Sequence, residues 1–195
     1  VERYHRFVKP RRGNIIIDAG AHVGVYTVEA AKAVGSEGRV IAIEPDPDNF
    51  RMLKFHIVLN RLDNVVALRL ALGSRIGKTQ LFRLGSPHNI ISDVSTSLKT
   101  KTLARCWVPI VTLDFLCYKL KVKDVDILKL DVEGAEVEVL KGMTKILPHR
   151  IVGEYHGLDN ARRLKKVLEE RGYEVLISNP EPSTEVGVFY ARHAR

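Results

Sequence analysis

The sequence is poor in the residues that build covalently or metal-stabilised folds. Its 195 residues include two cysteines, Cys106 and Cys117, which form no CxxC pair and have no histidine beside them at metal-ligand spacing. Neither a disulfide framework nor a zinc module is therefore expected, and this cysteine usage is typical of a reducing cytoplasm. A chain of this length buries roughly 70% of its unfolded surface without such staples, so we expect one domain over residues 1–195.

Long apolar runs are also missing. The most apolar stretch, residues 15–34, contains Asp18, Glu29 and Lys32 and is interrupted by two glycines, which indicates a strand, a loop and a helix instead of a membrane span. The N-terminal basic segment, residues 1–12, holds five arginines and lysines but has no apolar run behind it, unlike a secretory signal. The sequence therefore predicts a cytoplasmic protein without a membrane span.

Acidic residues are outnumbered by basic ones, 23 to 31, which gives a formal net charge of +8. A positive field attracts polyanions, and this keeps RNA open as a partner. The basic residues are spread over many segments, however, and that distribution is more typical of a solvated surface.

Short apolar runs alternate with stretches of helical periodicity. Residues 14–18 and 39–43 are runs that predict buried strands, and residues 23–34 between them carry an apolar stripe at helical spacing. Further strands are predicted at 65–70, 80–84, 125–130 and 151–155, and further helices after Pro45, over 136–147 and over 160–171. Such alternation requires parallel strands joined by right-handed crossovers, which makes the fold a doubly wound α/β sheet.

Two segments break this alternation. Residues 173–178 and 186–191 predict two strands with a turn-rich stretch between them, so we expect a mostly parallel sheet with one antiparallel strand, at an edge or between neighbours. Residues 85–107 include one long polar run, and loops of this length in compact domains are commonly lids or binding loops. We interpret this segment as an acceptor loop.

The predicted parallel strands end in polar residues, at the edge of the sheet where such folds bind ligands. The polar residues at these strand ends are Asp18, Glu44, Asp131, Glu154 and His156. The loop after Asp18 contains Gly20 and Gly24 but lacks the third glycine of a dinucleotide fingerprint. Such a loop lets the backbone approach a nucleoside that has no diphosphate, and Glu44 is placed to accept both ribose hydroxyls. S-adenosylmethionine is a nucleoside of this kind.

Four motifs of this sequence resemble the FkbM-type family of S-adenosylmethionine-dependent methyltransferases. They are DAGAHVG at 18–24, IAIEPDP at 41–47, KLDVEGAEVEVLKG at 129–142 and GEYHG at 153–157. The resemblance covers residues 13–156, and its most specific part is DVEGAE…LKG. It implies a Rossmann-like class I methyltransferase fold, in which a seven-stranded sheet has an antiparallel last strand, and it implies methyl transfer, commonly to a hydroxyl.

The resemblance also implies a set of cofactor-binding residues. Carried onto this sequence, they are Asp18, Gly20, Ala21, His22, Gly24, Glu44, Pro45 and Asp131, with Glu44 on the ribose and Asp131 near the methionine end and the reacting centre. The sequence departs from the family pattern at His22, where asparagine is usual, and at Ser74, which replaces the usual acid after the third strand. These departures concern the contacts of the loop and of the adenine.

Methyl transfer to a hydroxyl needs a base beside the acceptor. Asp131 and His156 are both candidates for this catalytic role, because each follows a predicted strand at the same edge of the sheet. Together with Glu154 they also offer oxygen and imidazole ligands for a divalent cation, although we expect a site without a metal. Glu133 and Glu136 are expected to cap the following helix.

The acceptor is indicated only by composition. The hydroxyls and amides of residues 85–101 are of the kind that hold a sugar or polyol, which favours O-methylation of a glycan or small molecule. Aromatic and basic residues interleaved over 1–12 suit stacking on RNA, so an RNA methyltransferase is an alternative, and the same segment suits a docking strand or a cofactor lid. A non-catalytic nucleoside-binding protein is the second alternative.

Overall fold

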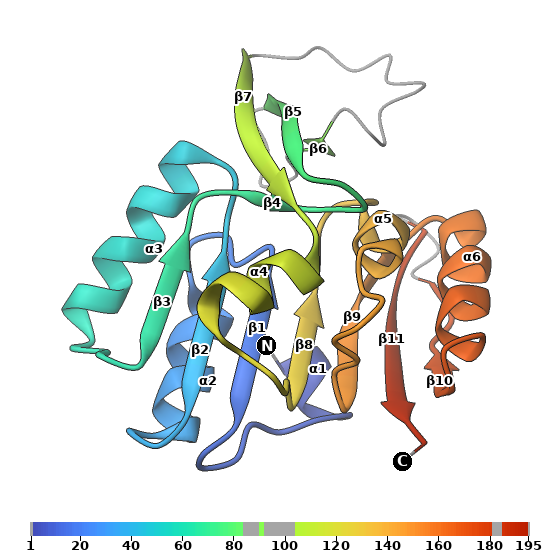
Figure 1. Ribbon diagram of the computed structural model, residues 1–195, viewed down its shortest axis with the longest axis horizontal. Coiled ribbons are helices and arrows are strands. Elements are labelled where there is room, and N and C mark those ends of the chain that lie inside the picture. Colours follow the sequence, from blue (N-terminus) through green and yellow to red (C-terminus); the bar gives the residue numbers. More distant parts are fainter. Residues whose placement is uncertain (1, 84–89, 92–103, 181–184, 195) are drawn as a thin grey trace.

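The computed structural model describes residues 2–83, 90–91, 104–180 and 185–194, and this part of the chain forms two sheets and six helices (Figure 1). The strands of the larger sheet are β1 (Ile15–Ala19), β2 (Arg39–Ile43), β3 (Val65–Leu68), β8 (Ile127–Leu130), β9 (Arg150–His156), β10 (Tyr173–Ile177) and β11 (Val186–His193). Those of the smaller sheet are β4 (Ala71–Leu72), β5 (Gly77–Arg83), β6 (Ile90–Ile91) and β7 (Ala104–Val111). The helices are α1 (Glu2–His5), α2 (Val25–Val34), α3 (Pro47–Leu59), α4 (Leu113–Leu120), α5 (Glu136–Lys141) and α6 (Leu158–Glu169).

The larger sheet has the strand order β10-β11-β9-β8-β1-β2-β3. β1 pairs in parallel with β2 and β8, and parallel pairing continues to β3 on one side and to β9 on the other. β11 pairs antiparallel with both β9 and β10 and is inserted between them. The prediction of a mostly parallel, doubly wound sheet of seven strands with an antiparallel last strand is therefore confirmed, and the last strand lies between neighbours and not at an edge.

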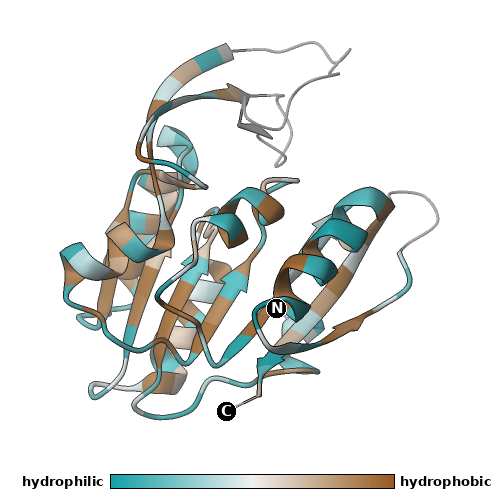
Figure 2. Ribbon diagram, turned by 45° about the vertical axis from the view of Figure 1, so that its right-hand side comes forward, coloured by the Kyte–Doolittle hydropathy of each residue, from teal (hydrophilic) through white to brown (hydrophobic). Residues whose placement is uncertain are grey.

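Helices cover both faces of the larger sheet, with α4, α5 and α6 on one face and α1 and α2 on the other (Figure 1). Neighbouring residues of β2 show the alternation, since Val40 packs in one cluster with Tyr26 of α2 while Ile41 packs in another with Leu116 of α4. A strand that is buried on both faces has an unbroken apolar sequence instead of an alternating one. Figure 2 shows these apolar strands enclosed by helices whose outer surfaces are hydrophilic.

The predicted helix over residues 136–147 is wrong in its second half, because α5 ends at Lys141. The carboxylate of Asp114 accepts hydrogen bonds from the backbone N–H groups of Thr144 and Ile146, both at 2.9 Å. These N–H groups would bond to preceding carbonyls in a continuous helix. Asp114, which is 30 positions away from Thr144, thus binds backbone groups that a longer helix would use. The hydrophobic periodicity of residues 136–147 does not reveal this contact.

The smaller sheet stands above the carboxyl ends of β1, β2 and β8 (Figure 1). Residues 80–84 were predicted as a strand of the main alternation. Residues 80–83 of this range belong instead to β5, which pairs antiparallel with β7, and residue 84 lies outside the described part. Of the predicted acceptor loop, residues 85–107, the structure shows β6 and the beginning of β7, and residues 85–89 and 92–103 lie outside the described part. The acceptor-loop interpretation therefore stays a prediction.

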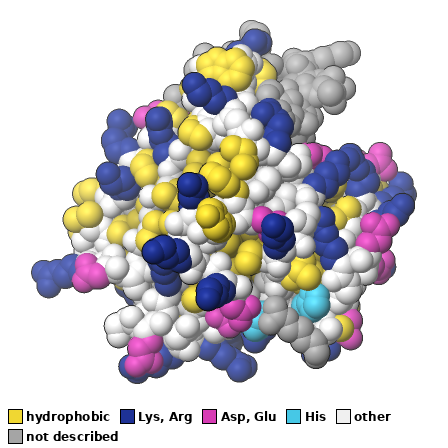
Figure 3. All heavy atoms as spheres, viewed as in Figure 1, with side chains coloured by type: hydrophobic (Ala, Val, Ile, Leu, Met, Phe, Trp, Pro, Cys, Tyr) yellow, Lys and Arg dark blue, Asp and Glu magenta, His cyan; other side chains and the backbone are white. Residues whose placement is uncertain are grey.

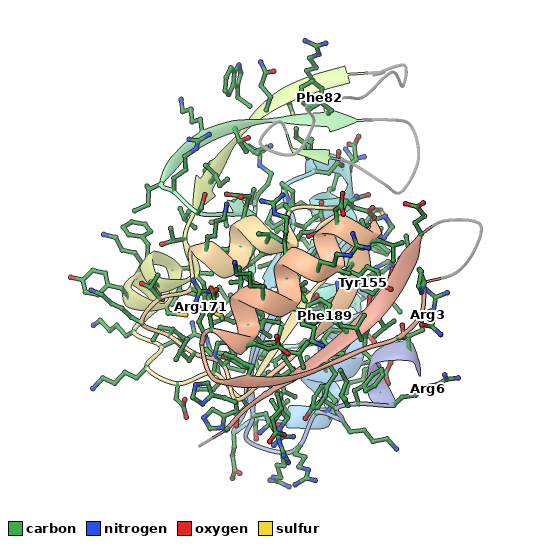
Figure 4. All side chains as sticks on the ribbon, turned by 90° about the vertical axis from the view of Figure 1, so that its right-hand side faces the viewer. Arg3, Arg6, Phe82, Tyr155, Arg171 and Phe189 are labelled. Atoms are coloured by element: carbon green, nitrogen blue, oxygen red, sulfur yellow. The ribbon has the colours of Figure 1, made fainter. Side chains whose placement is uncertain are left out.

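The N-terminal basic segment is partly built into the core. Tyr4 and Val8 are buried in the cluster that contains Tyr26, and the ring of Phe7 stacks on Tyr190 with 5.8 Å between centroids. Figure 4 shows Arg3 and Arg6 on the same segment, beside the sheet, while Phe82 lies far from them on the smaller sheet. Of the described helices, none has the length and apolar character needed to cross a membrane.

Candidate active site

The polar ends of β1, β2, β8 and β9 border one pocket, of about 270 Å³, between the larger sheet and the smaller one. Its lining consists of Ala19, Gly20, His22, Ile43, Glu44, Pro45, Asn49, Leu70, Ala71, Leu72, Leu81, Asp131, Val132, Glu133, Ala135 and Glu154. Five predicted site residues are thus brought together, namely Gly20, His22, Glu44, Pro45 and Asp131. The other four are Asp18, Ala21, Gly24 and His156, and these lie outside the lining.

Gly20 lets the loop after β1 close against the end of β8. Its φ angle is +76°, in the left-handed region, and a Cβ atom at this position would overlap the backbone carbonyl oxygen of Asp131. A side chain is therefore excluded on two grounds, backbone conformation and space. Gly20 and Asp131 are by this contact neighbours in the pocket wall.

His22 occupies the next special position of the same loop. It has a φ angle of +53°, and asparagine and histidine tolerate this left-handed conformation better than most residues do. Its backbone N–H donates to Oε2 of Glu44 at 2.8 Å. Position 22 thus requires a left-handed backbone conformation, which both asparagine and histidine can adopt.

The carboxylate of Glu44 is buried, at 5% exposure, and held through both oxygens. Oε2 accepts the N–H of His22, and Oε1 accepts the N–H of Asp46 at 2.9 Å. Burial raises the pKa of Glu44 and the two backbone hydrogen bonds lower it, with a net result of about 7. Each oxygen keeps a second lone pair, so the group can also accept two ribose hydroxyls.

Lys129, which was not predicted as a site residue, contacts three residues at this end of the sheet. Its ammonium donates to the carbonyl oxygen of Gly20 at 2.7 Å and lies 3.2 Å from Oδ1 of Asp18 and 3.6 Å from Oδ2 of Asp131. Burial lowers the pKa of Lys129, but the charges of Asp18 and Asp131 outweigh it and raise that pKa. The sequence did contain a signal for this contact. Lys129 interrupts an apolar strand and stands two residues before Asp131, so both side chains are expected on the same face.

Asp18 lies beneath the pocket and does not line it. It is fully buried, and its Oδ2 accepts the hydroxyl of Thr27 at 2.6 Å while its Oδ1 faces Lys129. Asp18 therefore supports the glycine loop and Lys129 instead of facing the pocket.

Tyr4, one of the N-terminal aromatic residues considered for stacking on RNA, is instead buried beside two acids of the pocket. Its hydroxyl lies 3.0 Å from Oδ2 of Asp131 and 3.2 Å from Oε1 of Glu154, within reach to donate to either carboxylate. Arg3 adds a contact of 3.4 Å between Nη1 and the same oxygen of Glu154. These partners are 127 and 150 positions apart from Tyr4, so no local pattern points to them.

His156 is bonded to carboxylates through both ring nitrogens. Nδ1 lies 3.0 Å from Oε1 of Glu136 and Nε2 lies 3.2 Å from Oε2 of Glu133. Burial lowers the pKa of His156, but the hydrogen bonds and charges of these two acids raise it to about 10. The ring is therefore an imidazolium that fastens the loop after β8, in which Glu133 has a left-handed φ of +52°. Glu136, expected to cap α5, lies in its first turn, where Oε1 also accepts the N–H of Gly134 at 3.0 Å, and both Glu136 and Glu133 contact His156 as well.

Asp131, Glu154 and His156 offer ligand atoms that lie within 4.8 Å of one another. Both ring nitrogens of His156 are engaged by Glu133 and Glu136, and the hydroxyl of Tyr4 lies within hydrogen-bond distance of one oxygen of each of the other two side chains. Each of the three side chains thus has protein partners, while Oδ1 of Asp131 and Oε2 of Glu154 take part in none of these contacts.

A glycine turn after β1, an acid after β2 and this strand order together define a class I S-adenosylmethionine-dependent methyltransferase. Residues 18–175 match the family described as "Methyltransferase FkbM domain", and the chain belongs to this family. The cradle formed by Gly20 and Glu44 fits an adenosine without a diphosphate, and S-adenosylmethionine is the cofactor.

Two curated relatives share about a quarter of their residues with this chain. "Methyltransferase 1" of Beauveria bassiana is 25% identical over 188 residues, covering 86% of this chain and 75% of the relative. "Hexuronic acid methyltransferase AglP" of Haloferax volcanii is 27% identical over 163 residues, covering 80% of this chain and 62% of the relative. The chain therefore spans only part of each relative.

Solved structures show the same fold at low identity. A methyltransferase FkbM from Methylobacillus flagellatus superposes with a TM-score of 0.63 at 17% identity, covering 98% of this chain and 50% of that one. Fibrillarin from Aeropyrum pernix, which has natively bound S-adenosyl-L-methionine, superposes with a TM-score of 0.59 at 16% identity, covering 93% of this chain and 67% of that one.

Proposed function

We propose that this protein methylates a hydroxyl group of a sugar-like acceptor, with Asp131 as the base. The observation that carries the proposal is the place of Asp131, which lines the pocket at the end of β8 and is held through Oδ2 by Lys129 and Tyr4. Its other oxygen, Oδ1, is then available to an acceptor.

The residues at the β1 and β2 ends would hold the cofactor. Glu44 would accept the ribose hydroxyls, the Gly20 loop would lie against the nucleoside, and Pro45 with Asn49 would border the adenine. When bound, S-adenosylmethionine supplies an activated methyl group on a sulfonium. The protein must then orient the acceptor oxygen and remove its proton.

Asp131 suits proton removal better than His156 does. The proton of the acceptor hydroxyl would pass to Oδ1 of Asp131, a step worth about 10²–10⁴-fold in rate. An imidazolium with a pKa of about 10 already carries its proton at neutral pH and lies outside the pocket lining. We therefore assign His156 to holding the loop that carries Asp131 and Glu133.

A sugar-like acceptor is supported by the carboxylates of the pocket, because they accept hydrogen bonds from hydroxyls. The Haloferax relative is named a hexuronic acid methyltransferase, and a hexuronic acid is a sugar-like acceptor that carries a carboxylate. RNA receives less support, since the described lining contains acids and His22 but no arginine or lysine. Figure 3 shows lysines and arginines dispersed over one face of the protein, with acids among them, and not gathered into one stripe.

The test is methyl transfer from labelled S-adenosylmethionine to pools of glycosides, polyols, lipid headgroups and RNA. We expect label in the glycoside or polyol pool. Label in RNA alone would support the alternative acceptor, and bound cofactor without transfer to any pool would support a non-catalytic nucleoside-binding protein.

A further inference from the structure

Two carboxylates of the pocket wall are joined from one side by a single phenol. The hydroxyl of Tyr4 lies within hydrogen-bond distance of Oδ2 of Asp131 and of Oε1 of Glu154, and both acids line the pocket. Tyr4 itself is 6% exposed and its ring packs edge-on against Tyr26, so the hydroxyl is held in place. The spacing of the two carboxylates is thereby set by the fold.

The contacts of both carboxylates use one oxygen each. Lys129 and Tyr4 contact Oδ2 of Asp131, and Arg3 and Tyr4 contact Oε1 of Glu154. The second oxygens, Oδ1 and Oε2, take part in none of these contacts. Carboxylate oxygens of the two acids lie within 4.8 Å of each other, so the pair suits a ligand with two neighbouring donors.

The surroundings of the pair are negatively charged. Among the described residues at or directly beneath the pocket, six acids face three cations. The acids are Asp18, Glu44, Asp131, Glu133, Glu136 and Glu154, and the cations are Lys129, His156 and Arg3. Lys129 and His156 are each shared between two acids, so neither leaves a positive charge for a ligand.

We propose that the acceptor is a neutral vicinal diol, whose first hydroxyl is methylated at Asp131 while its neighbouring hydroxyl donates to Glu154. This inference rests on the proposed function and narrows its substrate class. A carboxylate or phosphate beside the reacting hydroxyl is repelled by Asp131 and Glu154 and has no hydrogen to donate to them. The sulfonium donor, being a cation, is favoured by the same field.

Matched pairs of sugars test this inference. The probes are the methyl glycosides of glucose and galactose, the corresponding glucuronide and galacturonide, and deoxy sugars that lack one hydroxyl. Binding is measured calorimetrically on the complex with S-adenosylhomocysteine, and methyl transfer is measured with labelled S-adenosylmethionine. We expect a neutral glycoside to bind at least tenfold more tightly than its uronate, and to lose about tenfold when the hydroxyl beside the methylated one is absent.

Variants connect the discrimination to Glu154. Glu154→Gln keeps an acceptor for Tyr4 but removes the charge, so we expect the ratio of neutral to uronate affinity to fall at least fivefold. Glu169→Gln, an exposed acid on α6, is the matched control and should leave that ratio unchanged. Binding of S-adenosylmethionine to both variants verifies that they are folded.

The outcomes separate the two proposals. Equal or tighter binding of a uronate, or a ratio that Glu154→Gln leaves unchanged, overturns the neutral diol while sugar methylation stands. If no sugar of either charge binds or is methylated, although the cofactor binds, then sugar methylation fails and the diol fails with it.

Discussion

Lys129 on β8 and Asp18 on β1 are direct neighbours across two parallel strands, with 3.2 Å between Nζ and Oδ1. Both side chains are buried, at 4% and 0% exposure. A buried charge is tolerated when it is paired and hydrogen-bonded, and Lys129 also donates to the carbonyl oxygen of Gly20. The pair thus joins β1, which leads into the Gly20 loop, to β8, which Asp131 follows directly.

We expect Lys129→Met to lower the free energy of unfolding by about 3–5 kcal/mol, because Asp18 then remains as a buried charge without its partner. Urea denaturation measures this change. The double variant Asp18→Asn, Lys129→Met should regain part of the loss, whereas Lys165→Met on the exposed face of α6 should change stability by less than about 0.5 kcal/mol. A loss below about 1 kcal/mol for Lys129→Met would show that the pair contributes little.

Cofactor affinity should depend on pH through Glu44, whose pKa is about 7. Ribose hydroxyls donate to the ionised carboxylate, so binding favours the ionised form. Affinity is then constant above that pKa and falls as pH decreases below it, by at most about tenfold per pH unit. This change is measured by calorimetry of S-adenosylmethionine binding at pH values from about 5.5 to about 8.5, in steps of roughly 0.5 pH unit.

Glu44→Ala should weaken cofactor binding at pH 8 by more than about tenfold, or 1.4 kcal/mol, and remove the pH dependence. Glu37→Ala, which changes an exposed acid outside the pocket, is the control and should behave like the unchanged protein. Unaltered affinity in Glu44→Ala would refute the ribose assignment.

Replacement of Asp131 by asparagine should lower turnover by about 10²–10⁴-fold, since the amide cannot take the acceptor proton. The side chain keeps its size, so cofactor affinity and unfolding free energy should change little. Steady-state rates on whichever acceptor the labelling pools identify provide the measurement. Asp159→Asn, at an exposed position of α6, is the matched control. A fully active Asp131→Asn enzyme would remove Asp131 from the catalytic role.

His156 should make stability depend on pH in the alkaline range. Its pKa in the folded protein is about 10, above the value near 6.5 of an unfolded chain, because Glu133 and Glu136 favour the charged ring. The stabilisation is therefore complete below about pH 6.5 and is lost as pH rises through about 10. Denaturation of the protein and of His156→Gln at several pH values measures it. Identical pH profiles for the two proteins would contradict the assignment.

The alternating sheet could be predicted because its signal is local. Residues 39–43 are predicted and observed as a strand with the same bounds, and both ends of the 14–18 strand shift by one residue. The helix over 136–147 failed because Asp114, from another part of the chain, binds the N–H groups that would have continued it. Hydrophobic periodicity indicates which side chains prefer burial. It contains no information about a hydrogen bond from a carboxylate far away in the sequence.

The candidate site divides in the same way. The sequence allowed Gly20, Glu44 and Asp131 to be predicted as pocket residues. They follow strands whose carboxyl ends must meet at one edge of a parallel sheet. The contacts of His156 with Glu133 and Glu136 could not be predicted from the sequence, although all three residues lie in recognised motifs. Spacing cannot distinguish a histidine that faces a pocket from one that is turned into the loop behind it.

Local features of the chain predicted a parallel α/β sheet with an antiparallel last strand, and they placed a glycine loop and acids at the strand ends. They could do so because the effect of an apolar run, a glycine or an acid depends mainly on its own position in the sequence. Long-range packing, by contrast, places Lys129 against the Gly20 loop and Tyr4 against Asp131 and Glu154. Those contacts bring together residues more than a hundred positions apart, and packing, not local preference, selects such pairs.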